Sequence, residues 1–186
     1  MKAKASFLSA AFILFTALNS IAATFESGEY TTISRVVNDN LYIAGAGLTI
    51  NAPIFGDLTA AANTLTINDS IHEDVLAAAG DILIHSYIGD DATLFGGNVK
   101  ILADIKGDLI IFGGNVQIAK EVVIEGDLII FAGQCIMNGK VNGEVRIWGE
   151  EVLFNGIAND KVEIKADKIN VNGIVFGNAR LSANEI

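Results

Sequence analysis

The chain has 186 residues, a formal net charge of −10 and a composition that is 51% hydrophobic, with 19 glycines, one proline and one cysteine. This acidity makes nucleic acid and anionic membrane surfaces poor partners, and a single cysteine excludes an intramolecular disulfide. The apolar content and the glycines are typical of a β-rich repeat and not of a disordered chain.

Residues 1–22 have the layout of a secretory signal peptide. Lys2 and Lys4 precede an apolar run from Phe7 to Leu18, and small residues follow it. The run is about twelve residues long, which is short for a membrane span. We therefore expect cleavage after Ala22 or the next residue, with an uncleaved anchor as the alternative. The mature chain is then periplasmic or extracellular, has no membrane span, and carries a net charge of −12 after losing two lysines.

The next segment, residues 23–38, fits the repeat that follows it poorly. We expect it to form an N-terminal cap or a partial coil. At the other end, the repeat continues to Ile186 with no capping segment after it. The last coil is therefore expected either to present an open sheet edge or to continue in a longer protein.

Residues 39–186 repeat with a period of seventeen. An acidic residue marks each repeat, with one step of nineteen in the series Asp57, Asp74, Asp91, Asp108, Asp127 and Glu144. Counting the acid as position zero, positions one, three, eight and ten are apolar and position five is always small. Position fourteen supplies a third apolar column, which we assign to Ile54, Ile71, Ile88, Ile105, Val122 and Val141. Its register is ambiguous near Ile157.

This pattern predicts an all-β fold. Apolar residues at alternate positions indicate strands with one buried face, and the small residue at position five indicates a tight corner. Three short strands per repeat predict a triangular parallel β-helix of about nine 17-residue coils, roughly 40 Å long. The connection rule for parallel strands favours a right-handed coil, and seventeen is not a multiple of the six residues of left-handed hexapeptide helices.

The acidic column at position zero has two interpretations. Stacked carboxylates about 5 Å apart could be bridged by a cation such as calcium. Alternatively, each acid lies at a corner and bonds its own backbone in an Asx turn, and the glycines before Asp57, Asp108 and Asp127 suit such a turn. We favour the turn, and we expect no metal, cofactor or catalytic residue.

Three further residue types have structural explanations. Position eleven carries an asparagine column that should hydrogen-bond along the rod and tolerate left-handed backbone, in Asn51, Asn68, Asn138, Asn155 and Asn172. His85 lies in this column and His72 in another, so the two do not form a catalytic pair. Cys135 occupies an inward apolar column, so we expect it to be a core residue.

The strongest candidate for function is an apolar stripe at outward positions. Position four reads Phe95, Phe112, Phe131 and Trp148 on four consecutive coils, and position two adds Leu76, Ile110 and Ile129. The rings could simply stack on one another at the surface. Because a contiguous apolar patch is uncommon on soluble monomers, we predict that these seven residues form a contact face for another protein chain.

The coil pattern resembles that of one known family. Gly56-Asp57-Leu58, Gly107-Asp108-Leu109 and Gly126-Asp127-Leu128 open coils, and Gly96-Gly97-Asn98-Val99 and Gly113-Gly114-Asn115-Val116 follow at corners. Over residues 39–186 these segments resemble bactofilins, polymer-forming β-helical proteins of bacteria, and especially their exported relatives. The resemblance implies a right-handed triangular β-helix that joins end to end into non-polar filaments without nucleotide. The signal peptide departs from cytoplasmic bactofilins, and the C-terminal segments of many exported relatives are not found here.

The sequence is compatible with three functions. The first is a non-enzymatic, self-assembling scaffold of the cell envelope, which associates end to end and also laterally. The second is a binding module or adhesin that uses the aromatic stripe to hold a glycan or an envelope protein. The third is a polysaccharide-processing enzyme, which usually needs long excursions between coils to carry a site. Because coil length varies by only two residues, we favour the scaffold and do not expect an enzyme.

Overall fold

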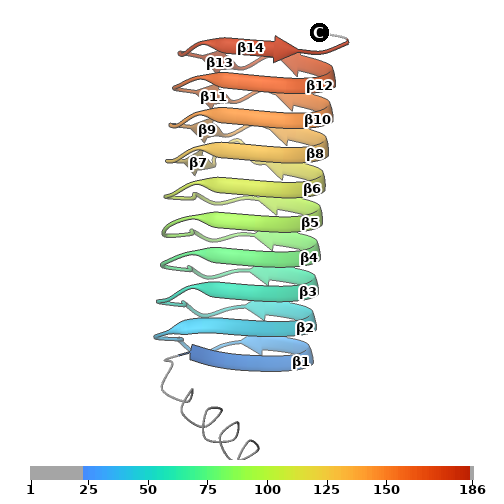
Figure 1. Ribbon diagram of the computed structural model, residues 1–186. Coiled ribbons are helices and arrows are strands. Elements are labelled where there is room, and N and C mark those ends of the chain that lie inside the picture. Colours follow the sequence, from blue (N-terminus) through green and yellow to red (C-terminus); the bar gives the residue numbers. More distant parts are fainter. Residues whose placement is uncertain (1–22, 185–186) are drawn as a thin grey trace, which may run out of the picture.

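The computed structural model describes residues 23–184, and the predicted signal peptide therefore lies outside the described residues. This part of the chain winds into a single stack of coils, a parallel β-solenoid (Figure 1). In Figure 1 the near strands run from left to right as the chain rises, so the coil is right-handed. The all-β solenoid with 17-residue coils is thus confirmed.

The strands form two parallel sheets. The larger has ten strands, in the order β1 (Ala23–Ile33), β2 (Asn40–Ile50), β3 (Leu58–Ile67), β4 (Val75–Ile84), β5 (Ala92–Ile101), β6 (Leu109–Ile118), β8 (Leu128–Met137), β10 (Val145–Phe154), β12 (Val162–Val171) and β14 (Ala179–Ser182). The smaller has four, in the order β13 (Ile174–Val175), β11 (Ile157–Ala158), β9 (Lys140–Val141) and β7 (Val123–Ile124). At about 4.8 Å per strand, ten coils make a rod roughly 43 Å long.

The first two arms of each coil are one continuous strand and not two. The buried positions change from odd to even along each strand, as in β5, where positions one, three, eight and ten are buried. This change places a corner at the small residue. A Cβ built on Gly96 would lie 2.8 Å from a methyl group of Val99, and one on Gly113 would lie 2.9 Å from Val116. Crowding between positions five and eight therefore explains why position five is always small.

The third arm shows where the two extra residues enter. Ile105 bridges to Ile124, and Ile124 pairs with Val141, so the inward column passes through Ile124 and our assignment of Val122 to it was wrong. The extra residues form a turn closed by the bond from Val122 N–H to the Ala119 carbonyl, 3.3 Å long. Farther along, Ala158 pairs with Val141 and takes the inward place.

Residues 23–38 form a coil of the same kind as the others. Strand β1 pairs with β2 at the usual offset, from Ala23 with Asn40 to Ile33 with Ile50. Val37 then bridges to Ile54 in the third arm. The expectation of a cap or partial coil is therefore corrected, because backbone pairing continues the repeat although the side chains of this segment match it poorly.

The inward columns form one continuous apolar core. Leu109, Ile111 and Ile118 of β6 are all 0% exposed. Among the side chains that the structure describes, none that is buried is polar or charged. Each coil can bury these side chains only against its neighbours, so stability is a sum over adjacent coils and the terminal coils are the weakest.

Candidate functional site

The aromatic stripe is a stacked column of rings. In-register pairing of β5, β6, β8 and β10 places Phe95, Phe112, Phe131 and Trp148 at equivalent positions on consecutive coils. Their ring centroids are 5.1, 5.0 and 4.6 Å apart, and adjacent ring planes differ by at most 7°. The three phenylalanines are 43%, 40% and 39% exposed. Mutual stacking, worth about 0.5–1.5 kcal/mol per pair, therefore leaves a large apolar surface in solvent.

Stacking decides which part of each ring a partner could touch. The faces of Phe112 and Phe131 are covered by their neighbours in the column. Ring edges consequently point outward. The flanking Leu76 is 49% exposed, and Ile110 and Ile129 are half-buried beside the rings. The column thus exposes ring edges and aliphatic groups, which suit packing against an apolar protein surface.

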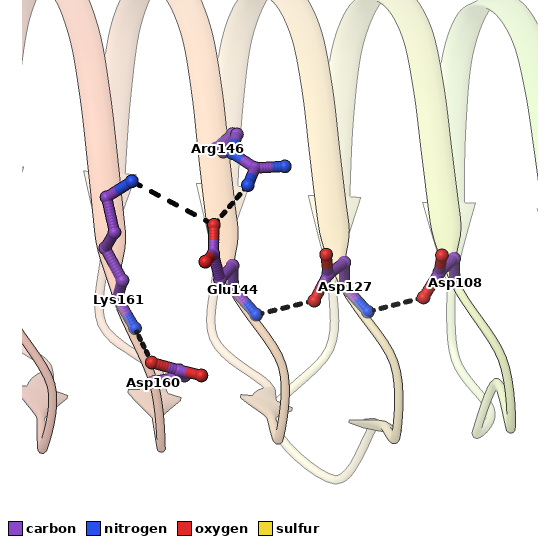
Figure 2. A network of polar contacts seen from close by, with 6 residues as sticks. All are labelled: Asp108, Asp127, Glu144, Arg146, Asp160 and Lys161. Atoms are coloured by element: carbon purple, nitrogen blue, oxygen red, sulfur yellow. Dashed lines mark hydrogen bonds and ion pairs between the residues drawn. The ribbon is translucent and has the colours of Figure 1, made fainter.

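The acidic column has a bonding pattern that the sequence did not indicate. Asp91 Oδ1 accepts the N–H of Asp108, Asp108 Oδ1 accepts the N–H of Asp127, and both distances are 2.7 Å. Asp127 Oδ1 in turn accepts the N–H of Glu144 at 2.8 Å (Figure 2). Each carboxylate therefore bonds the backbone of the next coil, and the expected Asx turns on the residue's own backbone are not what these acids form.

These bonds outweigh the repulsion between the acids. A hydrogen bond to a charged group contributes about 1.5–3 kcal/mol, whereas neighbouring carboxylates about 5 Å apart repel by somewhat under 1 kcal/mol at water-like screening. The N–H that each acid accepts lies at a corner of the coil. Asp and not Glu suits this position, because its short side chain spans one coil spacing. The acidic column is thus a structural element of the corner.

Glycine before the acid makes room for the shortest of these bonds. A Cβ on Gly107 would lie 2.1 Å from Asp91 Oδ1, and a Cβ on Gly126 would lie 2.2 Å from Asp108 Oδ1. No glycine in residues 23–184 has a positive φ, so the glycines are not there for a left-handed turn. Where a side chain stands before the acid the bond is longer, 3.3 Å from the N–H of Asp74 after Glu73 and 3.1 Å from the N–H of Asp91 after Asp90.

The column ends at Glu144, as Figure 2 shows. The longer Glu144 side chain pairs with Arg146 and lies 4.0 Å from Lys161 Nζ. The N–H of Lys161 is accepted instead by Asp160 Oδ1, at 2.7 Å. Lys161 can therefore stand at position zero in place of an acid, because the carboxylate of Asp160 accepts the backbone N–H at this corner.

One group of acids has the spacing of a cation site. Oxygen atoms of Asp74, Asp90 and Asp91 lie within 4.8 Å of one another, and all three residues are exposed. Partial desolvation, followed by repulsion from Asp91, Asp74 and Asp108, raises the pKa of Asp90. The oxygens of Asp74 and Asp91 already accept backbone N–H groups, so the corner bonds explain this group without a metal.

The asparagine column bonds along the rod, but without left-handed backbone. Asn68 Nδ2 donates to Asn51 Oδ1 at 2.8 Å, and Asn172 Nδ2 donates to Asn155 Oδ1 at 3.0 Å. Within residues 23–184 no residue has a positive φ. The backbone N–H of His85 continues the same corner pattern by donating to the Ile67 carbonyl, at 2.8 Å.

His72 belongs to an aromatic group that sequence reasoning missed. Its ring stacks on Phe55 with centroids 4.3 Å apart and meets the edge of Tyr87 at 6.5 Å. Ser70 Oγ lies 3.4 Å from His72 Nε2. Phe55 and His72 are seventeen residues apart, so the period would have predicted their contact. The group is exposed at the surface, where stacking is sufficient to explain it.

A groove on the second arm was also missed. It has a volume of about 490 Å³ and follows the outward side chains of β3 to β8. Amide groups run along it, with Asn98 Nδ2 donating to Asp81 Oδ1 at 2.7 Å and Asn115 Nδ2 to Asn98 Oδ1 at 2.9 Å. The signal in the sequence was the polar column at position seven, which contains Thr64, Asp81, Asn98, Asn115 and Gln134.

Cys135 lies in the core with 1% of its surface exposed. Burial raises the pKa of its thiol to about 12. Only about one thiol in ten thousand is then ionised at pH 8, and the thiolate is the reactive form. We expect the native chain to resist a maleimide at pH 8 and to take up one equivalent once it is unfolded in urea. Rapid stoichiometric labelling of the native chain, followed by mass spectrometry, would contradict this placement.

The chain was compared with family models, curated proteins and solved structures. None of the three comparisons finds a match. Within residues 23–184 there is also no helix of the length and apolarity that a membrane crossing requires. The class of protein is therefore defined by the fold alone, as a parallel β-solenoid.

Proposed function

We propose that this chain is a non-enzymatic structural protein of the cell envelope, a rod that assembles through its coil ends. The observation that carries the proposal is the regular stack of coils, whose parallel strands pair at an offset of seventeen at every step but one within residues 23–184. Val171 is 38% exposed, although the equivalent Ile118, Met137 and Phe154 on earlier coils are 0% exposed. An inward side chain is thus covered by the coil that stacks on it, and a coil of a second chain could cover it in the same way.

The last coil is suited to receive another coil. Its described inward side chains beyond Val171 are also apolar, and Val175, Ala179 and Leu181 are half-buried or exposed. Strand β14 pairs with β12 on one side only within the described residues. An edge strand with free N–H and C=O groups is a template for pairing with a further chain. Stacking a coil on this end would bury apolar surface at about 25 cal/mol per Å².

Two observations favour a scaffold over an enzyme or a glycan-binding module. Across residues 23–184 the strand offsets are seventeen except at one step of nineteen, so no long loop projects to build a site. The ring faces that a sugar would stack on are covered along the middle of the aromatic column. The scaffold is also the role that the resemblance to bactofilins implies, and the signal-peptide-like start of the sequence supports a site of action in the cell envelope.

The test is a charge placed on the end coil. We expect Val171→Glu in the full chain to reduce end-to-end association at least tenfold in sedimentation velocity, because a carboxylate would face the incoming coil. Ile136→Glu is the matched control, since Ile136 is 39% exposed but lies on the side of the rod. Equal association of parent, variant and control would refute end-to-end assembly, and so would a parent that stays monomeric at high concentration.

A further inference from the structure

One side of the rod is free of charge over six consecutive coils. We call this the lateral face. It consists of two outward columns on the first arm, one running from Tyr42 to Ile129 at position two and the other from Ala44 to Phe131 at position four. None of its twelve side chains is charged, although the chain carries 22 acidic residues. Arg146, Glu163 and Lys165 restore charge on the coils beyond it.

The two halves of the lateral face differ in height. On β2, β3 and β4, position four carries Ala44, Ala61 and Ala78, which are all exposed. On β5, β6 and β8, the same column carries three stacked phenylalanines. The face therefore has a shelf of three small residues followed by a ridge of three large ones, with the boundary between Ala78 and Phe95.

We propose that two copies of this chain pair through their lateral faces, with their rods antiparallel. A two-fold axis at the boundary would place the ridge of each copy on the shelf of the other, as an isologous interface requires. Ala78 would then oppose Phe95, and Ala61 would oppose Phe112. In the second column Thr59 would oppose Ile110. Each opposed pair in the position-four column joins a small residue to a large one.

A parallel arrangement fits less well. It would set the position-four column of one copy against the position-two column of the other, so that Phe112 would oppose Ile110 while Ala61 would oppose Thr59. The summed size of the opposed side chains would then vary from coil to coil, and a gap would remain over the alanine shelf. Because gaps forfeit packing contacts, the antiparallel arrangement is favoured.

Charge favours this face for a contact between two copies. Two chains that each carry a net charge of −10 repel over most of their surface, and the lateral face offers a broad uncharged region where they can meet. An arm about 13 Å wide over six coils offers roughly 370 Å² per copy, which is less than the roughly 800 Å² of a stable interface. Pairing of single rods is therefore weak, and rods joined end to end would multiply it.

The pairing should strengthen with salt. The acidic column borders the lateral face, so antiparallel copies bring two acidic columns to the same rim. Packed sheets lie about 10 Å apart, close to the Debye length at 0.1 M salt. Salt at 0.5 M therefore screens this repulsion without weakening the apolar contact.

The inference rests on the proposed role in self-assembly but uses another surface, so the two can fail separately. In the full chain carrying Val171→Glu, which removes end-to-end contacts, we expect a dimer in sedimentation equilibrium that is tighter in 0.5 M than in 0.05 M NaCl. Ala61→Glu should weaken this dimer at least tenfold. Thr66→Glu, with the same charge on the second arm of the same coil, should leave it unchanged. No dimer, or equal loss in both variants, would overturn the proposal.

Cross-linking tests the antiparallel geometry directly. When Thr59→Cys and Ile110→Cys chains are mixed, a short bismaleimide should join the two different variants. Two copies of Thr59→Cys should not be joined, because the two-fold axis separates them by three coils, about 14 Å along the rod. Cys135 is buried and gives no background. Cross-linking of Thr59→Cys to itself in preference to the mixture would show parallel pairing and overturn the proposal.

Discussion

Replacing Gly107 by alanine is expected to lower the free energy of unfolding by about 2–4 kcal/mol. The added Cβ would lie 2.1 Å from Asp91 Oδ1 and 2.8 Å from the carbonyl carbon of Asp90. The carboxylate must then move away from the N–H of Asp108, which it accepts at 2.7 Å. The variant loses a hydrogen bond to a charged group and leaves a corner N–H without its acceptor. Urea denaturation followed by circular dichroism measures the loss.

The matched control for this variant is Asp90→Ala, one coil earlier in the same column. Position 90 already carries a Cβ, so alanine adds no clash there. The pKa of Asp90 is raised in the folded chain, so the stability linked to this group is full below its ordinary pKa and is lost as the pH rises through the raised pKa. Removing the carboxyl should therefore leave stability at neutral pH unchanged or slightly higher. A Gly107→Ala chain as stable as the parent would contradict the spatial explanation of the glycines.

The second large effect is expected in the core. Ile111 is 0% exposed and lies between Leu94 and Ile130 in its column. Ile111→Ala should lower the free energy of unfolding by about 2–5 kcal/mol, because the solenoid cannot collapse around the cavity. Leu181→Ala changes the same column on the last coil, where the side chain is half-buried.

The Leu181→Ala variant should lower the free energy of unfolding by less than about 1 kcal/mol, because a side chain in the terminal coil has fewer contacts to lose. Denaturation of both variants in urea, at protein concentrations low enough to prevent association, makes the comparison. Equal losses at Ile111 and Leu181 would show that the last coil is as well packed as the middle of the rod, and the proposed assembly surface would then lose its basis.

Much of this fold could be predicted from the period. Because each coil repeats the previous one, residues seventeen apart must stack, and this placed the buried columns and the aromatic rings without a structure. The wrong predictions concern features that the seventeen-residue period does not determine. The two extra residues of one coil could lie on either side of Val122, and only backbone pairing shows that Ile124 holds the register.

The bonds of the acidic column could not be predicted for a related reason. A stacked Asp57 series is compatible with bonds within a coil or between coils, and the period does not distinguish them. The spacing of Gly107 and Asp108 looked like turn chemistry, although its cause is the carboxylate of Asp91 on the preceding coil. Contacts between columns, such as Tyr87 against His72, also depend on side-chain directions that the sequence does not contain.

We infer that this rod extends itself through its end coil. Electron microscopy of the negatively stained full chain over a range of concentrations tests it most directly. We expect rods whose lengths are multiples of a single solenoid of roughly 43 Å. They should lengthen with concentration, and Val171→Glu should shorten them to single or side-paired rods. Rods of one unit length at every concentration, identical in the parent and in Val171→Glu, would contradict it.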